Sequence, residues 1–371
     1  MRILQTPPRF FPYVGGVEQV VLYLSRELAK RGHSVEVVCA NEPAVGNGII
    51  EGITVKRLAY CGKIGNTNIT FSLPYELKRR DFDLIHTHLP TPWSADWSAI
   101  FSRIKNKPLF LSYYNDISGS GVNKIIANFY NATALKFLLK RAHRIFINQE
   151  NYLNTSPFLK SFKDKIIVVP LGVDTAKFHP ANVNKNNNEK IIFFLSILDR
   201  FHTYKGLDCL FSALKNVIPT TPVKLYIGGF GQLSDFYKNL AKETGLENNV
   251  IFLGRLSDEE LLYYYSLCNF FVLPSVSSTQ EGFGLVALEA MACCRPVVIS
   301  DIVGVADSVR KENAGIVVKP NDSQELSQAL KHLLLNEKEC EQMGKNAYRL
   351  ASAKYALHNY IDAVEKEYLT I

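Results

Sequence analysis

Residues 281–289 read Glu-Gly-Phe-Gly-Leu-Val-Ala-Leu-Glu, and they lie between two short apolar runs, Phe270–Leu273 and Val297–Ile299. The glycines predict a turn that opens a helix, so the segment reads strand, loop, helix, strand. The backbone N–H groups of such a turn face any phosphate or hydroxyl at the helix N-terminus. Two carboxylates eight positions apart belong to the same segment. This spacing alone favours an ordinary amphipathic helix with two solvated glutamates over a ligand site.

The same alternation runs along the rest of the chain. Residues 17–31 have helical spacing, end at Gly32 and lead into a Val-rich run. Other short apolar runs predict strands at residues 83–86, 109–111, 144–147, 191–195, 224–227 and 250–253, with helical segments between them. Short apolar strands alternating with helices are typical of a parallel sheet covered on both faces. The predicted fold class is therefore α/β.

A polar, Asn-rich tract at residues 182–188 cannot support a core and predicts a domain boundary. Strand and helix patterns resume after it. We therefore expect two Rossmann-like parallel-sheet domains, residues 1–170 and 189–345, joined by a linker at 171–188 and facing a central cleft.

Composition excludes several classes of protein. The chain has 371 residues, 47% hydrophobic and 21% charged, which suits two or three globular units. No apolar run approaches the roughly 18–20 residues of a membrane span, and the N-terminus lacks the apolar core of a secretory signal, so a cytoplasmic location is expected. Seven scattered cysteines without a Cys-x-x-Cys pair favour buried thiols over disulfides or zinc.

The net charge of +7 is unevenly distributed. Residues 1–180 carry 23 basic and 13 acidic side chains, a net +10, and residues 181–371 carry 19 basic and 22 acidic, a net −3. Within the basic half, residues 124–144 mix large apolar side chains with five Lys and Arg, a composition typical of an interfacial amphipathic helix. A core helix with snorkelling lysines has the same pattern. The domain charge favours contact with an anionic membrane surface, which would make the protein peripheral on the inner face of the cell membrane; no nucleic-acid partner is expected.

Two more segments follow predicted strands and precede predicted helices. Arg200-Phe-His-Thr-Tyr-Lys205-Gly206 places two cations at the edge of a sheet where open α/β folds bind ligands, and Arg and Lys there would neutralise a diphosphate. Gly15-Gly16-Val17-Glu18 is a second Gly-rich turn at a helix start. Each segment alone is a weak signal.

In this order the segments resemble the retaining glycosyltransferases of family 4, which have the GT-B fold. The resemblance covers nearly the whole chain and includes His86-Thr-His88, Val169-Pro-Leu-Gly172-Val-Asp174 and Gly254-Arg-Leu256. It implies transfer of a hexosyl unit from a UDP- or GDP-linked sugar to a saccharide or lipid-linked acceptor, as in cell-surface glycan synthesis. It further implies no metal ion or other cofactor, and a C-terminal helix at 346–371 that packs back on the first, acceptor-binding domain.

The resemblance also implies roles for individual residues. Arg200 and Lys205 look like the diphosphate clamp, Glu281 like the residue that orients the transferred sugar, and Glu289 like the ribose ligand. The implied donor-binding backbone is that of Phe283, Gly284 and Leu285 for the sugar, Arg255 and Leu256 for the base, and Gly16 for the diphosphate or acceptor. Positioning and electrostatics would then carry the reaction, rather than a strong general base.

Two departures from the family pattern stand out. Relatives commonly have a histidine where this chain has Tyr114, within Ser112-Tyr-Tyr-Asn-Asp116. A phenol with an ordinary pKa of about 10 exchanges protons poorly at neutral pH, so either Tyr114 is a positional substitute or Asp116 carries more of the work. The second departure is Cys294, where relatives usually have glycine; we expect it to tighten a helix-to-strand turn.

Other motifs have plainer interpretations. Asp81-Phe-Asp83 resembles a metal-binding Asp-x-Asp but directly precedes a strand, which favours a solvated lead-in. His86 and His88 lack further ligands nearby, so a structural or cleft-lining role is favoured over metal. The alternatives to a glycosyltransferase are a nucleotide-sugar epimerase or phosphorylase of the same fold, and a non-catalytic protein that binds polyanions or membranes.

Overall fold

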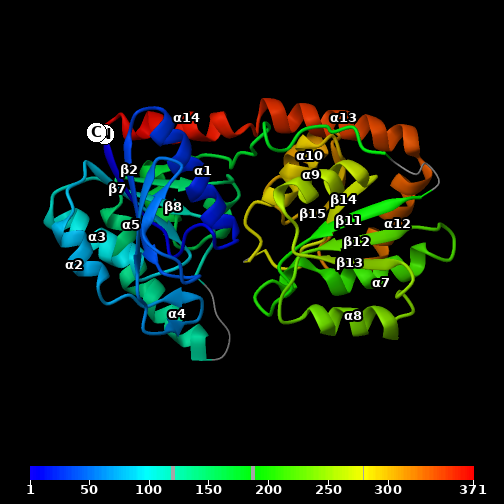
Figure 1. Cartoon of the computed structure of the whole chain (residues 1–371), viewed down its shortest axis with the longest axis horizontal. Helices are drawn as coiled ribbons and strands as arrows, with labels where there is room; N and C mark the ends of the chain where they lie inside the picture. Colours follow the sequence, from blue (N-terminus) through cyan, green and yellow to red (C-terminus); the bar gives the residue numbers. More distant parts are fainter. Residues whose placement is uncertain (118–121, 185–188, 279) are drawn as a thin grey trace. The chain divides into compact units, whose positions relative to one another are not determined.

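The computed structural model describes residues 1–117, 122–184, 189–278 and 280–371, and the chain divides into two compact units (Figure 1). The first contains Met1–Leu171 and His358–Ile371, and the second contains Gly172–Leu357. Apart from Leu171, the described residues of the expected linker group with the second unit, as do residues 346–357. The last helix, α14 (Leu357–Tyr368), belongs almost entirely to the first.

The first unit is built on an eight-stranded sheet with the order β10-β9-β8-β7-β1-β2-β4-β3. All neighbours pair in parallel except β3 and β4. Its strands are β1 (Arg2–Thr6), β2 (Ser34–Ala40), β3 (Gly48–Ile50), β4 (Ile53–Leu58), β7 (Leu84–Leu89), β8 (Leu109–Tyr113), β9 (Arg144–Ile147) and β10 (Ile166–Val168), and a separate hairpin joins β5 (Lys63–Ile64) to β6 (Thr67–Asn68).

Helices cover both faces of this sheet, which is why its central strands are buried along their whole length. On one face, Leu4 and Ile85 pack in a single core with α2, α3 and α5. On the other, Phe110 contacts Tyr368 of α14, and Glu365 of α14 pairs with Arg31 at the end of α1. The helices of the unit besides α14 are α1 (Gly16–Lys30), α2 (Leu73–Arg79), α3 (Ser94–Ile104), α4 (Val122–Ala132), α5 (Ala134–Arg141), α6 (Tyr152–Thr155) and the 3-10 helix η1 (Lys160–Lys165).

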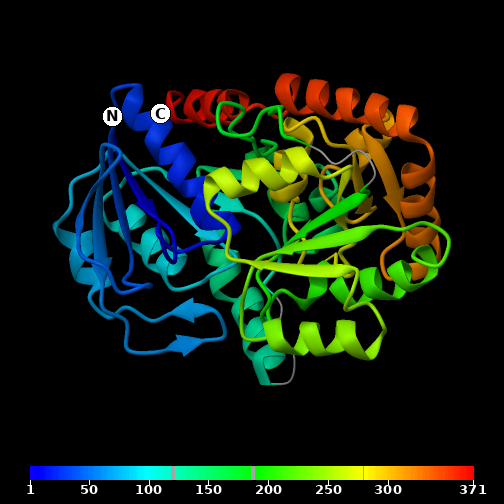
Figure 2. The ribbon, with the colours of Figure 1, turned by 45° about the vertical axis from the view of Figure 1, so that its right-hand side comes forward.

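The second unit has a six-stranded, fully parallel sheet with the order β13-β12-β11-β14-β15-β16 (Figure 2). Alternate residues of β11 face opposite sides: Ile192 and Phe194 join the core under α7, α8 and α12, while Phe193 stacks against α9. The strands are β11 (Ile191–Leu195), β12 (Lys224–Gly228), β13 (Val250–Gly254), β14 (Phe270–Leu273), β15 (Val297–Ser300) and β16 (Gly315–Val318). The helices are η2 (Thr203–Lys205), α7 (Leu207–Val217), α8 (Ser234–Glu243), α9 (Asp258–Leu267), α10 (Leu285–Ala292), α11 (Ala306–Lys311), α12 (Ser323–Leu335) and α13 (Glu337–Ala353).

Each sheet has one point at which its strand order reverses. In the first unit this point lies between β1 and β7, and in the second between β11 and β14. Loops that leave the carboxyl ends of two such strands diverge and open a ligand-binding crevice. We therefore expect ligand-binding residues in the loops after β1, β11 and β14.

Candidate functional site

In the second unit, the loops after β11 and β14 are joined by their backbones. Val276 donates an N–H hydrogen bond to the Tyr204 carbonyl at 2.8 Å. Gly206 has a φ of 79°, and a Cβ at this position would lie 2.0 Å from the carbonyl oxygen of Pro274. Only glycine permits this approach, so the sequence Lys205-Gly206 sets the path of the loop.

Lys205 and Glu281 meet where these two loops converge. The Lys205 ammonium donates to both oxygens of Glu281, at 2.8 Å and 3.1 Å, and the Ser275 hydroxyl donates to the same carboxylate. The Glu281 side chain is only 2% exposed. Burial by itself lowers the pKa of Lys205, but Glu281 and the Tyr204 phenol outweigh it and raise this pKa above its usual value. Lys205 is thus a stable cation held at the switch point of the sheet.

The turn that follows Glu281 leads into α10. Gly284 precedes the helix with a φ of 87°, a conformation that favours glycine, and Leu285 is the first helical residue. Phe283 is buried, with its ring 5.7 Å from that of Tyr355. The N–H groups of Ala287 and Leu288 donate to the Gly284 carbonyl, whereas those of Leu285 and Val286 come too early in the helix to have an acceptor within it. The N–H groups of Leu285 and Val286 supply donors for a phosphate or a hydroxyl.

Glu289 lies further along α10 and is held by a different partner. The Tyr265 hydroxyl of α9 donates to it at 2.8 Å. Burial raises the pKa of Glu289 to about 7, although the Tyr265 hydrogen bond and Lys177 act in the opposite direction. Glu289 therefore titrates near neutral pH, and its carboxylate is available to accept hydroxyl donors.

The remaining predicted residues of this unit lie at the same sheet edge. Arg200 is exposed on the loop after β11. Arg255, also exposed, directly follows β13, and its guanidinium lies 5.6 Å from the ring of Phe230. Leu256 is half-buried, and its side chain lies over Gly228, where a Cβ would come within 2.8 Å of it.

In the first unit, Gly16 is the first residue of α1, at the loop that leaves β1. A Cβ on Gly16 would meet no heavy atom of the described residues within 4 Å, so its surroundings are open on the Cβ side. Glu18, two residues later, is buried in the first turn of the same helix.

Tyr114 and Asp116 have different hydrogen-bond partners. Tyr114 is 8% exposed, and its hydroxyl lies 3.2 Å from Nδ1 of His88. Burial raises the pKa of this phenol far above its usual value, so it does not exchange protons near neutral pH. Asp116 instead accepts hydrogen bonds from the hydroxyls of Tyr113 at 2.6 Å and Ser156 at 2.7 Å.

The two motifs whose spacing resembles that of metal ligands are bonded to other side chains of the chain. His86 and His88 are fully buried: His86 contacts the hydroxyls of Tyr368 and Ser112, and His88 also contacts the side-chain oxygen of Gln5 at 2.9 Å. Asp81 and Asp83 both pair with Arg2. Across the described ranges of the chain, no three His, Cys, Asp or Glu side chains gather as a metal site.

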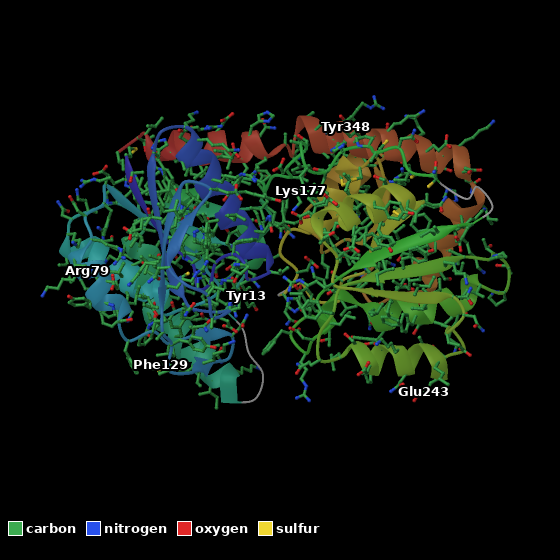
Figure 3. The ribbon with its side chains drawn as sticks, viewed as in Figure 1. Tyr13, Arg79, Phe129, Lys177, Glu243 and Tyr348 are labelled. Atoms are coloured by element: carbon green, nitrogen blue, oxygen red, sulfur yellow. The ribbon has the colours of Figure 1, made fainter. Side chains whose placement is uncertain are left out.

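Residues 124–144 are not a single helix. The segment comprises α4, α5 and the start of β9. In α5 the residues Leu135, Leu138 and Leu139 are buried, so this helix belongs to the core. In α4 the side chains of Ile125 and Phe129 are 71% and 73% exposed, and Phe129 is labelled in Figure 3. No helix among the described residues is long and apolar enough to cross a membrane.

Sequence reasoning missed two residues of the second unit. Ser275, which donates to Glu281, lies two residues after the end of β14, and a position just beyond the carboxyl end of a strand is a signal for a site residue. Tyr265, which donates to Glu289, has no such signal, because it lies in a helix that has Tyr at three consecutive positions.

Two family models together match most of the chain. "Glycosyltransferase Family 4" matches residues 14–177, and "Glycosyl transferases group 1" matches residues 176–350. The O-antigen chain mannosyltransferase C of Escherichia coli is 28% identical over 379 residues, which cover 100% of this chain and 99% of the relative.

Solved structures share the fold. Sucrose-phosphate synthase from Thermosynechococcus elongatus aligns with a TM-score of 0.81 at 21% identity, over 100% of this chain and 98% of that one. Anabaena HepE in complex with UDP-glucose aligns with a TM-score of 0.78 at 20% identity, over 100% of both chains. The chain belongs to the glycosyltransferases of family 4 and group 1, enzymes with the GT-B fold.

Proposed function

We propose that this glycosyltransferase moves a hexosyl unit from a UDP- or GDP-linked sugar to a saccharide or lipid-linked acceptor in glycan synthesis. The observation that carries the proposal is the Lys205–Glu281–Ser275 cluster at the switch point of the second sheet. It pairs a cation suited to a diphosphate with a carboxylate suited to sugar hydroxyls. The similarity to an O-antigen mannosyltransferase and to a structure that holds UDP-glucose supports this choice of substrates.

In the proposed mechanism the acceptor oxygen bonds to the anomeric carbon on the face from which the diphosphate departs, so the anomeric configuration is retained. The bond between that carbon and the phosphate oxygen breaks, and the acceptor proton passes to the departing diphosphate. Lys205 and Arg200 stabilise the charge that develops there, and the N–H groups that open α10 orient the sugar. No metal ion takes part in the proposal.

The other residues receive positioning roles. Glu289 accepts the ribose hydroxyls, and the backbone at Arg255 and Leu256 holds the base. Gly16, with its open Cβ side, lets the diphosphate or the acceptor approach the backbone. Tyr114 acts as a positional substitute, since its pKa excludes proton exchange near neutral pH. Asp116 retains its hydrogen bonds to Tyr113 and Ser156.

The test begins with thermal-shift screening against UDP, GDP and their sugars, followed by turnover assays with and without EDTA and NMR of the anomeric configuration of the product. Glu281→Gln keeps the shape of the side chain and removes its charge, and we expect it to lower kcat by about 100-fold or more, in line with the loss of transition-state positioning. Glu325→Gln, on α12 and outside this cluster, is the control. Unchanged turnover in Glu281→Gln would contradict the assignment, and epimerisation without an acceptor would favour the epimerase alternative.

We also propose that α4 docks the protein on anionic lipid at the inner face of the cell membrane. Its exposed Ile125, Ile126 and Phe129 belong to the unit whose sequence carries most of the positive charge. Apolar insertion and electrostatic attraction then act together. Phe129→Ser should weaken co-sedimentation with vesicles containing phosphatidylserine. Phe236→Ser, which replaces another exposed phenylalanine, on α8, should not. Vesicle binding that depends neither on anionic lipid nor on the salt concentration would contradict this docking mode.

A further inference from the structure

The loop between β1 and α1, residues 7–15, is held by two buried arginines. Arg57 of β4 is 6% exposed and donates hydrogen bonds to the carbonyl of Phe11 within the loop and to that of Gly46. Arg9 lies in the loop itself and is 3% exposed. A buried guanidinium is stable only where its donors have acceptors. The partners of Arg9 therefore decide the conformation of the loop.

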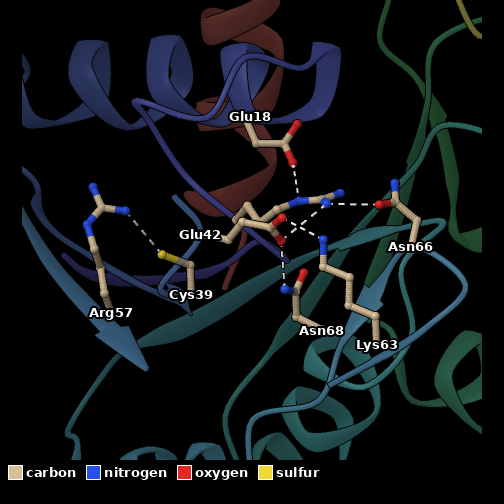
Figure 4. Close-up of polar contacts among 8 residues, drawn as sticks. Glu18, Cys39, Glu42, Arg57, Lys63, Asn66 and Asn68 are labelled. Carbon is tan, nitrogen blue, oxygen red and sulfur yellow. Dashed lines mark hydrogen bonds and ion pairs between the residues drawn. The ribbon is translucent and has the colours of Figure 1, made fainter. Parts of the chain in front are cut away.

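Arg9 reaches three different segments (Figure 4). Its Nε donates to Glu18 Oε1 in the first turn of α1 at 3.2 Å, and its Nη1 donates to Asn66 Oδ1 in the β5–β6 hairpin at 2.9 Å. The same Nη1 lies 3.7 Å from Glu42 Oε2, in the segment after β2. The guanidinium also stacks on the ring of Tyr13, at 4.2 Å from the ring centroid.

Glu42 extends this cluster into the hairpin. Its carboxylate accepts hydrogen bonds from the Lys63 ammonium and, at 2.7 Å, from the side-chain amide of Asn68 (Figure 4). We name the six residues Arg9, Glu18, Glu42, Lys63, Asn66 and Asn68 the polar clasp. It contains two basic and two acidic side chains. Removing Glu18 leaves the buried guanidinium of Arg9 without one of its carboxylate partners, whereas Lys63 is exposed.

One residue of the polar clasp, Glu18, lies against the Gly15–Gly16 turn. A Cβ on residue 15 would lie 2.3 Å from Glu18 Oε2, so the Glu18 carboxylate folds back over Gly15 and a side chain there would displace it. Gly15 and Glu18 are thus matched to one another, and Arg9 holds Glu18 in this position. This contact fixes the orientation of the turn's backbone and of the first N–H groups of α1.

We propose that Arg9, Glu18 and Glu42 are positioning residues that hold the Gly15–Gly16 turn and the β5–β6 hairpin in the conformation that receives the acceptor. This inference rests on the proposed function and, of the two ligands proposed there for the backbone at Gly16, it chooses the acceptor rather than the donor diphosphate. The turn lies at the reversal of strand order between β1 and β7, the place at which open α/β sheets bind ligands. The clasp itself contacts neither substrate.

The experiment compares Glu18→Gln with a matched control, Glu76→Gln. Both changes remove the acidic group of a buried glutamate of the first unit that pairs with an arginine, Glu18 with the buried Arg9 and Glu76 with the half-buried Arg80. The side chains of Glu18 and Glu76 are 5% and 8% exposed. Amide hydrogen exchange of peptides spanning residues 7–20 and the KM values for donor and acceptor are measured for both variants and the unchanged protein.

We expect Glu18→Gln to accelerate exchange in residues 7–20 and to raise the acceptor KM by about tenfold or more, with the donor KM changed by less than about twofold. Glu76→Gln should leave exchange in residues 7–20 and both KM values unchanged. Equal effects of the two variants, or unchanged exchange in Glu18→Gln, would overturn the inference. If the unchanged protein transfers no sugar, the proposed function fails, and the exchange measurement still decides whether the clasp holds the loop.

Discussion

Individual residues of the second unit owe their chemistry to partners that are distant in the sequence. Lys205 and Glu281 are 76 positions apart, and Tyr265 lies 24 positions before Glu289. In each pair one member shifts the pKa of the other: Glu281 raises the pKa of Lys205, and the Tyr265 hydroxyl lowers the pKa of Glu289 against the larger effect of burial. The site therefore consists of pairs rather than of single functional groups.

Glu289 should make nucleotide binding depend on pH. Its pKa of about 7 means that it is partly protonated at neutral pH, and ribose hydroxyls donate more strongly to the ionised carboxylate than to the neutral acid. Affinity for the nucleotide should therefore rise from pH 6 to pH 8 by up to about tenfold and level off above about pH 8. Isothermal titration with UDP or GDP measures this. In Glu289→Gln the slope should vanish, and a slope that persists would exclude Glu289 as its cause.

The same shift has a consequence for stability. A carboxyl whose pKa is raised from 4.5 to about 7 on folding binds a proton more readily in the folded state, so stability falls as pH rises through this range. Glu289→Gln, which cannot ionise, should gain stability relative to the unchanged protein at pH 8 and show little gain at pH 5. Urea unfolding at the two pH values tests this, and equal gains at both would contradict it.

Cys294 occupies a backbone conformation that favours glycine. Its φ is 61°, in the turn between α10 and β15, and such a conformation costs a residue with a Cβ about 1–2 kcal/mol. Cys294→Gly should therefore raise the free energy of unfolding by up to about 1 kcal/mol, since the added freedom of the unfolded chain offsets part of the gain. Cys294→Ala keeps the Cβ and should show no gain. A gain of the same size in Cys294→Ala would point to the thiol rather than the backbone.

At the scale of elements, α14 is joined to the first sheet by buried polar contacts as well as by packing. Its Tyr368 is fully buried, with the hydroxyl on Nδ1 of His86 and the ring 4.7 Å from that of Phe110. Three residues earlier on the same helix, Glu365 pairs with Arg31 and His33. The C-terminal helix thus completes the core of a unit that begins more than 350 positions earlier.

Tyr368→Phe should destabilise the first unit by about 1–3 kcal/mol, because it leaves a buried histidine nitrogen without its hydroxyl partner. Tyr348→Phe is the control: Tyr348 is 37% exposed on α13 and is labelled in Figure 3. Urea unfolding followed by circular dichroism provides the measurement. A loss below about 0.5 kcal/mol in Tyr368→Phe would show that packing alone holds the helix.

Sequence patterns did not predict every strand. The strands β7, β8, β9, β11, β12, β13, β14 and β15 were predicted within a few residues, because apolar runs between helices are a strong local signal. The hairpin strands β5 and β6 have two residues each, which is too short for any period to show. This limit matters for function, since the hairpin contributes three of the six residues of the polar clasp.

At the scale of the whole molecule, two units have separate cores, one around Leu4 and Ile85 and the other around Ile192 and Phe194. We expect two transitions in calorimetry, and a nucleotide at about 100-fold its Kd should add about 2.7 kcal/mol to the second unit alone. Glu76→Gln, in the first unit, should move only the other transition. A nucleotide that shifts the transition moved by Glu76→Gln would contradict the assignment of the donor to residues 172–357.

By itself the sequence determined the α/β class, the two-part organisation and the family, because strand and helix periods, glycine turns and motif order are local properties of the chain. Only the tertiary structure decided which side chains meet. It paired Lys205 with Glu281, directed Tyr114 to His88, and brought Arg9 to the β5–β6 hairpin. These contacts depend on strand order and on the turns at the sheet edges, which bring together residues tens of positions apart, and no short-range pattern encodes that proximity.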